Sequence, residues 1–234
     1  MKDTAHTEIE RVSNAIYQAI FERRLEPNTR LVESQLAKVL STSRTNVRQS
    51  LLLLAQRKLV KVAPNKGAVV AEPSRSEALE VFAARRCIER EIVRLVYRKC
   101  TLENPEALEV LHTHLREEQK SREAHDYFEL IRATGKFHLI LAEIAGNATL
   151  LDFLQQLIAR SSLILEKFES HGDKTCQENE HLKMVELLTD GTEEELVQLM
   201  DRHLSDIEQV LYFRKKGKPT DLSEVFAPIM SQVK

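Results

Sequence analysis

Apolar residues near the start of the chain recur at helical spacing in three stretches. These stretches predict helices over residues 8–24, 34–39 and 44–57. In the third stretch, Val47, Leu51 and Leu54 lie at i, i+4 and i+7 and form one apolar stripe. Ser43 stands directly before it, where a side-chain oxygen can accept from the free backbone N–H groups of a helix start. We therefore expect the third helix to begin after Ser43.

The pattern becomes strand-like after the third predicted helix. Two runs rich in β-branched residues, 59–63 and 68–71, flank the turn residues of 64–67. They predict a hairpin with Lys66 close to its tip. A helix, a helix–turn–helix and a two-stranded hairpin in this order predict a winged helix-turn-helix over residues 1–72.

The rest of the chain has helical spacing after a short expected linker, residues 73–76. Three motifs indicate helix starts, namely Asn104-Pro105, Thr175-x-x-Glu178 and Thr192-x-x-Glu195. Two glycines, Gly146 and Gly191, indicate helix ends. The predicted helices cover 77–99, 104–120, 124–145, 148–169, 175–189 and 192–215. We therefore predict a mainly α fold, in which an all-α bundle over 77–216 follows the winged helix and a C-terminal tail covers 217–234.

Composition and charge agree with two functional parts. Residues 1–72 hold 12 basic against 7 acidic residues, whereas residues 73–234 hold 22 against 29. A basic front favours a polyanion as partner, although an uneven solvated surface would give the same split. The chain has no apolar run near 20 residues, no secretory h-region at its start and no C-x-x-C among its three cysteines. We therefore expect a cytoplasmic protein without a membrane segment.

The third predicted helix carries candidate DNA-binding residues opposite its apolar stripe. Arg44, Thr45, Arg48 and Gln49 share this polar face. Arginine can fork onto a guanine edge or hold a phosphate, and hydroxyls at a helix start suit phosphate oxygens. Lys66 in the hairpin could reach an adjacent groove. Two arginines on a helix are more often a solvated face, but the helix–turn–helix and the basic hairpin favour DNA binding.

These residues carry a resemblance to a known family. Residues 30–37, 42–51, 59–60 and 64–68 resemble the winged helix of the GntR family of bacterial transcription regulators. The chain departs from the family pattern at Ser41, Thr42, Asn46 and Gln49, where the family usually has Gly, Val, Pro and Glu. The departures put the usual operator sequence in doubt. The resemblance implies a DNA-contact set of Arg30, Ser43, Arg44, Thr45, Asn46, Arg48 and Lys66.

Three histidines stand inside apolar stripes of different predicted helices: His138, His181 and His203. One such histidine is usually a satisfied core residue, but three that converge in one bundle would make a site for Zn²⁺ or a similar ion. Four other histidines are expected on polar faces or in loops, and they are His6, His114, His125 and His171.

The stripe histidines also resemble those of the FadR-type effector (FCD) domain of GntR regulators. The matching motifs are Arg85-x-x-x-Glu89, Phe137-His138, Ala145-Gly146-Asn147, Glu180-His181 and Met200-x-x-His203-Leu204. The resemblance implies a divalent metal on the three histidines, Zn²⁺ first, with Ni²⁺ or Mn²⁺ as alternatives. The family's fourth ligand, Asp or Asn, falls on Thr134, which is a poor ligand. An organic acid could complete the coordination, with Arg85 and Thr134 as effector-binding residues, or could bind the histidines and Arg85 directly without metal.

Together these features predict a homodimeric DNA-binding transcription regulator, a repressor of a double-stranded operator controlled by a small organic acid. Two alternatives stay open. A metal-dependent hydrolase would also use three histidines with an open position, although no H-E-x-x-H and no general base accompany them. An effector-blind DNA-binding protein would result if the pocket had decayed at Thr134.

Overall fold

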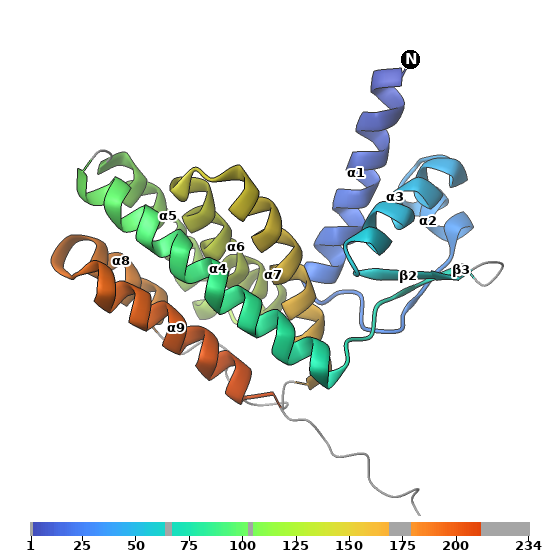
Figure 1. The fold of residues 1–234 in the computed structure, drawn as a ribbon. Helices are drawn as coiled ribbons and strands as arrows, with labels where there is room; N and C mark the ends of the chain where they lie inside the picture. The colour runs from blue at the N-terminus through green and yellow to red at the C-terminus, as the bar shows by residue number, and fades with distance from the viewer. Residues whose placement is uncertain (1, 64–66, 103–104, 169–178, 212–234) are drawn as a thin grey trace, which may run out of the picture.

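The computed structural model describes residues 2–63, 67–102, 105–168 and 179–211. A small winged helix stands beside a larger bundle of helices, and the first helix reaches from one to the other (Figure 1). The winged helix contains α1 (Lys2–Phe21), β1 (Arg30–Leu31), α2 (Glu33–Val39), α3 (Arg44–Gln56), β2 (Val60–Ala63) and β3 (Gly67–Val70). The bundle contains α4 (Arg75–Leu102), α5 (Pro105–Glu123), α6 (Tyr127–Ala145), α7 (Ala148–Phe168), α8 (Glu180–Asp190) and α9 (Glu193–Gln209). The prediction of a mainly α fold with an N-terminal winged helix is confirmed.

The third helix forms as its sequence pattern predicts. Ser43 is the N-cap of α3, and its Oγ accepts from the Asn46 backbone N–H at 3.1 Å. Val47, Leu51 and Leu54 are buried against α1 in one apolar cluster. Burial of this stripe leaves the opposite face of α3 in solvent, which is the face with the candidate DNA-binding residues.

The wing contains one strand more than the sequence pattern predicts. The sheet order is β1-β3-β2, and both neighbouring pairs are antiparallel. In β1, Arg30 and Leu31 pair with Val69 and Ala68 of β3. Two residues are too few for an alternating pattern, so only the pairing across the chain defines this strand.

The start of α4 differs from the predicted one because of a cap in the expected linker. Ser74 Oγ accepts from the backbone N–H of Glu77 at 3.1 Å, and the helix therefore begins at Arg75 instead of residue 77. Gly146 ends α6 in the left-handed conformation (φ 69°), and Thr192 with Glu195 forms the expected capping box of α9. The predicted capping box at Thr175 lies outside the described residues, and α8 begins at Glu180.

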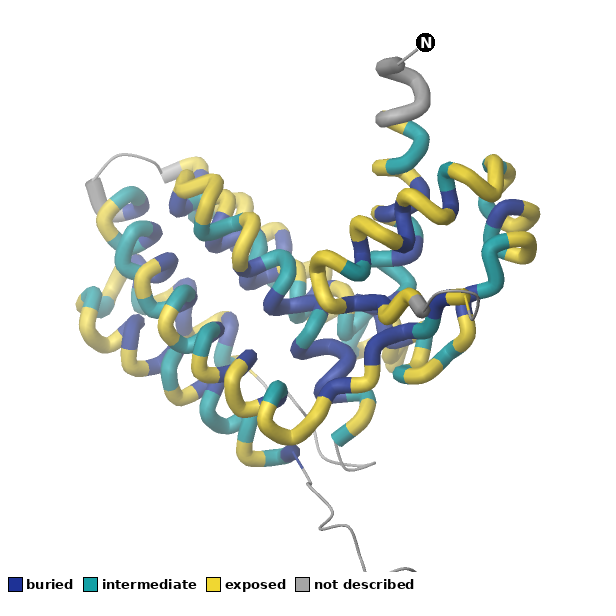
Figure 2. The backbone as a smooth tube through the Cα atoms, turned by 45° about the vertical axis from the view of Figure 1, so that its right-hand side comes forward, coloured by how far each residue is buried: buried dark blue, intermediate teal, exposed yellow. Residues whose placement is uncertain are grey.

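Buried residues line the inner faces of the bundle helices, as Figure 2 shows, and the long α4 packs along α9, α6 and α7. The end of α1 takes part in this bundle. Phe21 belongs to the bundle core, and the Tyr17 hydroxyl donates to the backbone carbonyl of Gln155 in α7 at 3.0 Å. The first helix therefore links the winged helix to the bundle through α7. Among the described residues, no helix is long and apolar enough to cross a membrane.

Candidate metal centre and nucleic-acid interface

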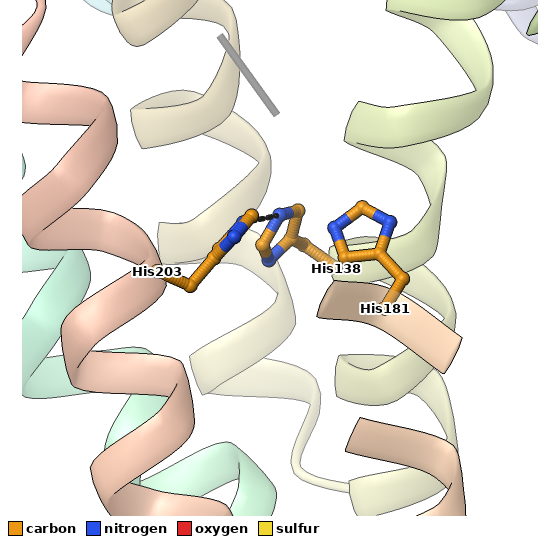
Figure 3. A group of neighbouring side chains, drawn as sticks. All are labelled: His138, His181 and His203. Carbon is orange, nitrogen blue, oxygen red and sulfur yellow. Dashed lines mark hydrogen bonds between the residues drawn. The ribbon is translucent and has the colours of Figure 1, made fainter. Parts of the chain in front are cut away.

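The three predicted histidines converge in the bundle from three helices. His138 comes from α6, His181 from α8 and His203 from α9, and their rings face one another (Figure 3). One nitrogen of each ring lies within 4.8 Å of the others, and the three residues are buried. The cluster can therefore hold a metal ion.

A carboxylate stands behind each histidine ring. His138 Nδ1 lies 2.6 Å from Oε2 of Glu89, which is a residue of α4. His181 Nδ1 lies 2.8 Å from Glu118 Oε2, and His203 Nδ1 lies 2.7 Å from Glu180 Oε2. A carboxylate behind the outer nitrogen fixes a metal-binding histidine in orientation and tautomer and makes its inner nitrogen more basic.

The carboxylates also determine which ring nitrogen can bind a cation. A carboxylate only accepts hydrogen bonds, so it favours the tautomer with the proton on Nδ1 and a lone pair on Nε2. The Nε2 atoms of His138 and His203 then face each other at 3.4 Å. Two lone pairs at this distance repel each other, and a cation between them removes the repulsion. The donor set therefore fits a divalent metal of the zinc type.

The protonation states agree with this assignment. Burial lowers the pKa of His138 to about 3, and it also lowers the pKa of His203. Burial acts to raise the pKa of Glu89, but the neighbouring Arg85 opposes it, and the pKa falls to about 2. The hydrogen bond from His203 lowers the pKa of Glu180. Neutral imidazoles with ionised carboxylates behind them are the forms that metal binding requires.

The histidines line a cavity of about 70 Å³. Arg85 also lines it, and its Nε donates to Glu89 Oε1 at 2.6 Å while its Nη1 donates to Ser161 Oγ at 3.1 Å. Thr134 lies on the same wall, and its hydroxyl donates to the backbone carbonyl of Ile131 at 3.1 Å. The structure therefore brings both predicted effector-binding residues to the histidine cluster.

Sequence reasoning missed the three carboxylates as parts of the site. Glu89 and Glu180 belong to motifs that carry the family resemblance, but the motifs assigned neither residue a role beside the histidines. Glu118 gave no signal at all, because it meets His181 only where α5 packs on α8. The placement of His114 on a polar face was wrong. This residue is 3% exposed, and its Nε2 lies 2.9 Å from the Ala133 carbonyl, because α5 packs against α6 on this side.

The candidate DNA-contact residues lie mostly on one exposed surface. Arg44, Thr45 and Arg48 are exposed on α3, and Arg30 is exposed on β1. Ser43 is exposed and caps α3, while the Asn46 side-chain amide donates to Thr42 Oγ1 at 3.2 Å. Lys66 lies outside the described residues.

Arg48 has a defined partner on this surface. Its Nε and Nη2 donate to the two carboxylate oxygens of Glu33 at 3.0 and 2.9 Å. Glu33 is the first residue of α2, so this ion pair connects the two helices of the helix–turn–helix. The pair holds the guanidinium at the exposed surface of α3.

Comparison with known proteins identifies both parts of the chain. The model described as "Bacterial regulatory proteins, gntR family" matches residues 8–70, and the model described as "FCD domain" matches residues 80–206. The HTH-type transcriptional regulator YdhC of Bacillus subtilis is 26% identical over 88% of this chain and 92% of its own length. The Nta operon transcriptional regulator of Aminobacter aminovorans is 24% identical over 76% of this chain and 82% of its own length.

Solved structures support the fold. McbR/YncC of E. coli has a TM-score of 0.73 at 22% identity, and the match covers 97% of this chain and 99% of that one. A GntR regulator from Rhodococcus sp. RHA1 has a TM-score of 0.72 at 22% identity, with coverage of 87% and 96%. These relatives are transcription regulators and not enzymes, so the hydrolase alternative is wrong. The chain belongs to the GntR family of DNA-binding transcription regulators, with an FCD domain as its C-terminal part.

Proposed function

We propose that the chain is a homodimeric repressor that binds a double-stranded operator and responds to a small organic acid held beside a metal ion. The observation that carries this proposal is the cluster of His138, His181 and His203 with a carboxylate behind each ring. A cytoplasmic location follows from the DNA target. In this proposal residues 1–72 bind DNA, residues 73–76 link the domains, and residues 77–216 bind the effector and the second subunit.

The exposed face of α3 is the proposed recognition surface. Arg44 and Arg48 would contact base edges or phosphates in the major groove, and Thr45 with Ser43 would contact phosphate oxygens near the helix start. Arg30, Asn46 and Lys66 complete the proposed contact set. A dimer doubles these contacts and sets the spacing of two half-sites, which is why we propose one.

Zn²⁺ is the metal that we propose for the three histidines. Their Nε2 atoms would hold it, while Glu89, Glu118 and Glu180 keep the rings in place. When bound, the ion supplies a Lewis-acidic centre with an open position for an oxygen ligand. The carboxylates make up in part for the missing ligand at position 134, since they increase the basicity of the coordinating rings.

The charges around the cluster favour an acid as effector. Arg85 pairs with Glu89, Arg122 pairs with Glu118, and Arg23 on the cavity wall adds a third positive charge against the negative charge of Glu180. A divalent cation makes the net charge of the site positive and makes the cavity attractive to a single carboxylate. A cavity of about 70 Å³ has room for a molecule of only a few heavy atoms. The presence of this cavity argues against an effector-blind protein.

An operator selected by the protein itself from random-sequence DNA tests the DNA-binding part. We expect Arg48→Ala to weaken operator binding by about 1–3 kcal/mol, or roughly ten- to a hundredfold. Arg57→Ala at the other end of α3 serves as the charge-matched control and should change binding by less than about threefold. Equal affinities for wild type and Arg48→Ala would rule out this recognition surface.

Calorimetry with Zn²⁺ alone tests the metal site in the purified, untagged protein. We expect one Zn²⁺ per chain, and loss of binding in His203→Gln. Absence of binding at micromolar Zn²⁺ would rule out the metal. A reporter gene behind the selected operator tests repression, and higher expression in the presence of the protein would show an activator instead.

A further inference from the structure

The cavity beside the three histidines is not lined by the FCD domain alone. Phe21, the last residue of α1, and Arg23, in the turn after it, also line the cavity, and both are buried. Phe21 reaches the cavity because position 135 has no side chain. A Cβ on Gly135 would lie 2.5 Å from Cε2 of the Phe21 ring. Since Gly135 stands one helical turn before His138, a residue of the DNA-binding domain forms the wall next to a metal ligand.

A buried polar chain leads from the histidine cluster to the helix α7. Glu89 contacts His138 with one carboxylate oxygen and accepts from Arg85 with the other. Arg85 donates in turn to Ser161 Oγ on α7. Arg85, Glu89 and Ser161 are at most 4% exposed, so water screens these contacts little.

The neighbouring serine of α7 holds the end of α1. Ser162 Oγ donates to the backbone carbonyl of Phe21 at 2.6 Å, and Ser162 is 5% exposed. Phe21 is the last residue of α1, where a helix leaves carbonyl groups without partners inside the helix. Two adjacent residues of α7 thus contact the histidine network on one side and the DNA-binding domain on the other.

The helix α1 in turn supports the recognition helix. Val12, Ile16 and Ile20 share one apolar core with the buried stripe of α3. Ser50 of α3 donates through its hydroxyl to the backbone carbonyl of Ile9 at 2.8 Å. A packed core shifts as a unit instead of deforming continuously, so a displacement at the end of α1 moves α3.

We propose that the contacts of Ser161 and Ser162, together with the Phe21 wall, couple occupancy of the cavity to the position of the recognition helix. The inference rests on the proposed function, in that the cavity takes a metal ion and a small acid. A ligand in the cavity can contact Phe21, Arg85 and Ser161 directly, because all three line it. It therefore favours one placement of α1 over another, and this difference changes DNA affinity.

The coupling can be measured as a ratio of two affinities. The dissociation constant for the selected operator is determined on the full chain without metal, with Zn²⁺ alone, and with Zn²⁺ and acetate, a small acid with a single carboxylate. The ratio compares the constant of the metal-free protein with that of the loaded protein. For the wild type we expect a ratio of about fivefold or more, the lower end of typical allosteric coupling. Because coupling is reciprocal, operator DNA should change the Zn²⁺ affinity by the same factor.

Two variants separate the coupling contact from an ordinary interdomain contact. Ser162→Ala removes the hydrogen bond to Phe21, whereas Tyr17→Phe removes the equivalent hydrogen bond from α1 to Gln155 of α7, away from the cavity lining. We expect Ser162→Ala to reduce the ratio to within about twofold of unity, well below typical coupling factors, while Tyr17→Phe keeps the wild-type ratio. If Ser162→Ala does not fold, Phe21→Leu, which shortens the wall, should show the same reduction.

A full wild-type ratio in Ser162→Ala, or an equal loss in Tyr17→Phe, would overturn the coupling role. A wild type that binds Zn²⁺ and operator with no effect of one on the other would overturn it as well. Failure to bind Zn²⁺ or to select an operator would instead count against the proposed function, since both are measured separately. The two failures are therefore distinguishable.

Discussion

Nδ1 of His138 lies 2.6 Å from Oε2 of Glu89, and both side chains are buried. Neither atom has a well-aligned hydrogen-bond partner among the described residues, although the two atoms are close. Arg85 shares the other oxygen of the same carboxylate. The Glu89 carboxylate therefore connects the histidine cluster to Arg85 on the cavity wall.

The carboxylate behind His203 is the most suitable one for a test, because Glu180 is less buried than Glu89 and Glu118. Glu180→Gln keeps the shape of the side chain but loses the charge that makes His203 a better ligand. We expect the Zn²⁺ affinity to fall by about ten- to a hundredfold. Calorimetry measures the change, and the exposed Glu186→Gln on the same helix should bind Zn²⁺ as the wild type does. Equal affinities for both variants would contradict the proposed role.

Position 134 offers a gain of function. Thr134→Asp places a carboxylate on the cavity wall one helical turn before His138. We expect the Zn²⁺ affinity to rise by about tenfold, which corresponds to about 1.4 kcal/mol. The new ligand should also weaken the effect of acetate, because it takes the position open to an acid. Thr134→Val is the control: the Thr134 hydroxyl donates to the Ile131 carbonyl, so its loss should leave Zn²⁺ binding unchanged.

The ion pair between Arg48 and Glu33 bears on DNA specificity. Glu33→Gln removes a negative charge beside the proposed DNA-binding surface and releases the guanidinium. We expect non-specific DNA to bind about threefold more tightly, with a steeper dependence on salt. The affinity for the selected operator should rise less, so the specificity ratio falls. Titrations with operator and unrelated DNA measure this ratio, and the exposed Glu26→Gln, with the same change in net charge, should leave it unaltered.

The buried histidines make the stability of the metal-free protein depend on pH. Burial lowers the pKa of His138 to about 3 and lowers the pKa of His203 and His114 as well. Below about pH 6.5 the unfolded chain binds protons at these residues that the folded chain does not. Stability should therefore fall with decreasing pH, by about 1.4 kcal/mol per pH unit for each histidine that stays neutral.

Urea denaturation of the metal-free protein at pH 7.5, 6.5 and 5.5 measures this slope. His203→Gln should show a smaller loss of stability over the same range, because one of the neutral histidines is gone. His112→Gln, at an exposed position of α5, should keep the wild-type slope. An unfolding free energy that is the same at pH 7.5 and 5.5 would contradict the buried neutral histidines.

Features that depend on residues close to one another along the chain follow from the sequence alone. The stripe of Val47, Leu51 and Leu54, the cap at Ser43 and the helix end at Gly146 follow from spacing and from local backbone chemistry. The same local patterns marked His138, His181 and His203, because a histidine inside an apolar stripe must face the core of its helix bundle.

The residues that these side chains contact depend on tertiary packing. Glu118 stands 63 residues before His181, and Phe21 lies 141 residues from Ser162, so no periodicity connects either pair. The two-residue strand β1 exists through its pairing with β3, and the burial of His114 results from the packing of α5 on α6. Local patterns determine which face of a helix is buried, but the packing of distant helices determines which residues contact that face. In this chain the packing places Phe21 of the DNA-binding domain on the wall of the histidine cavity.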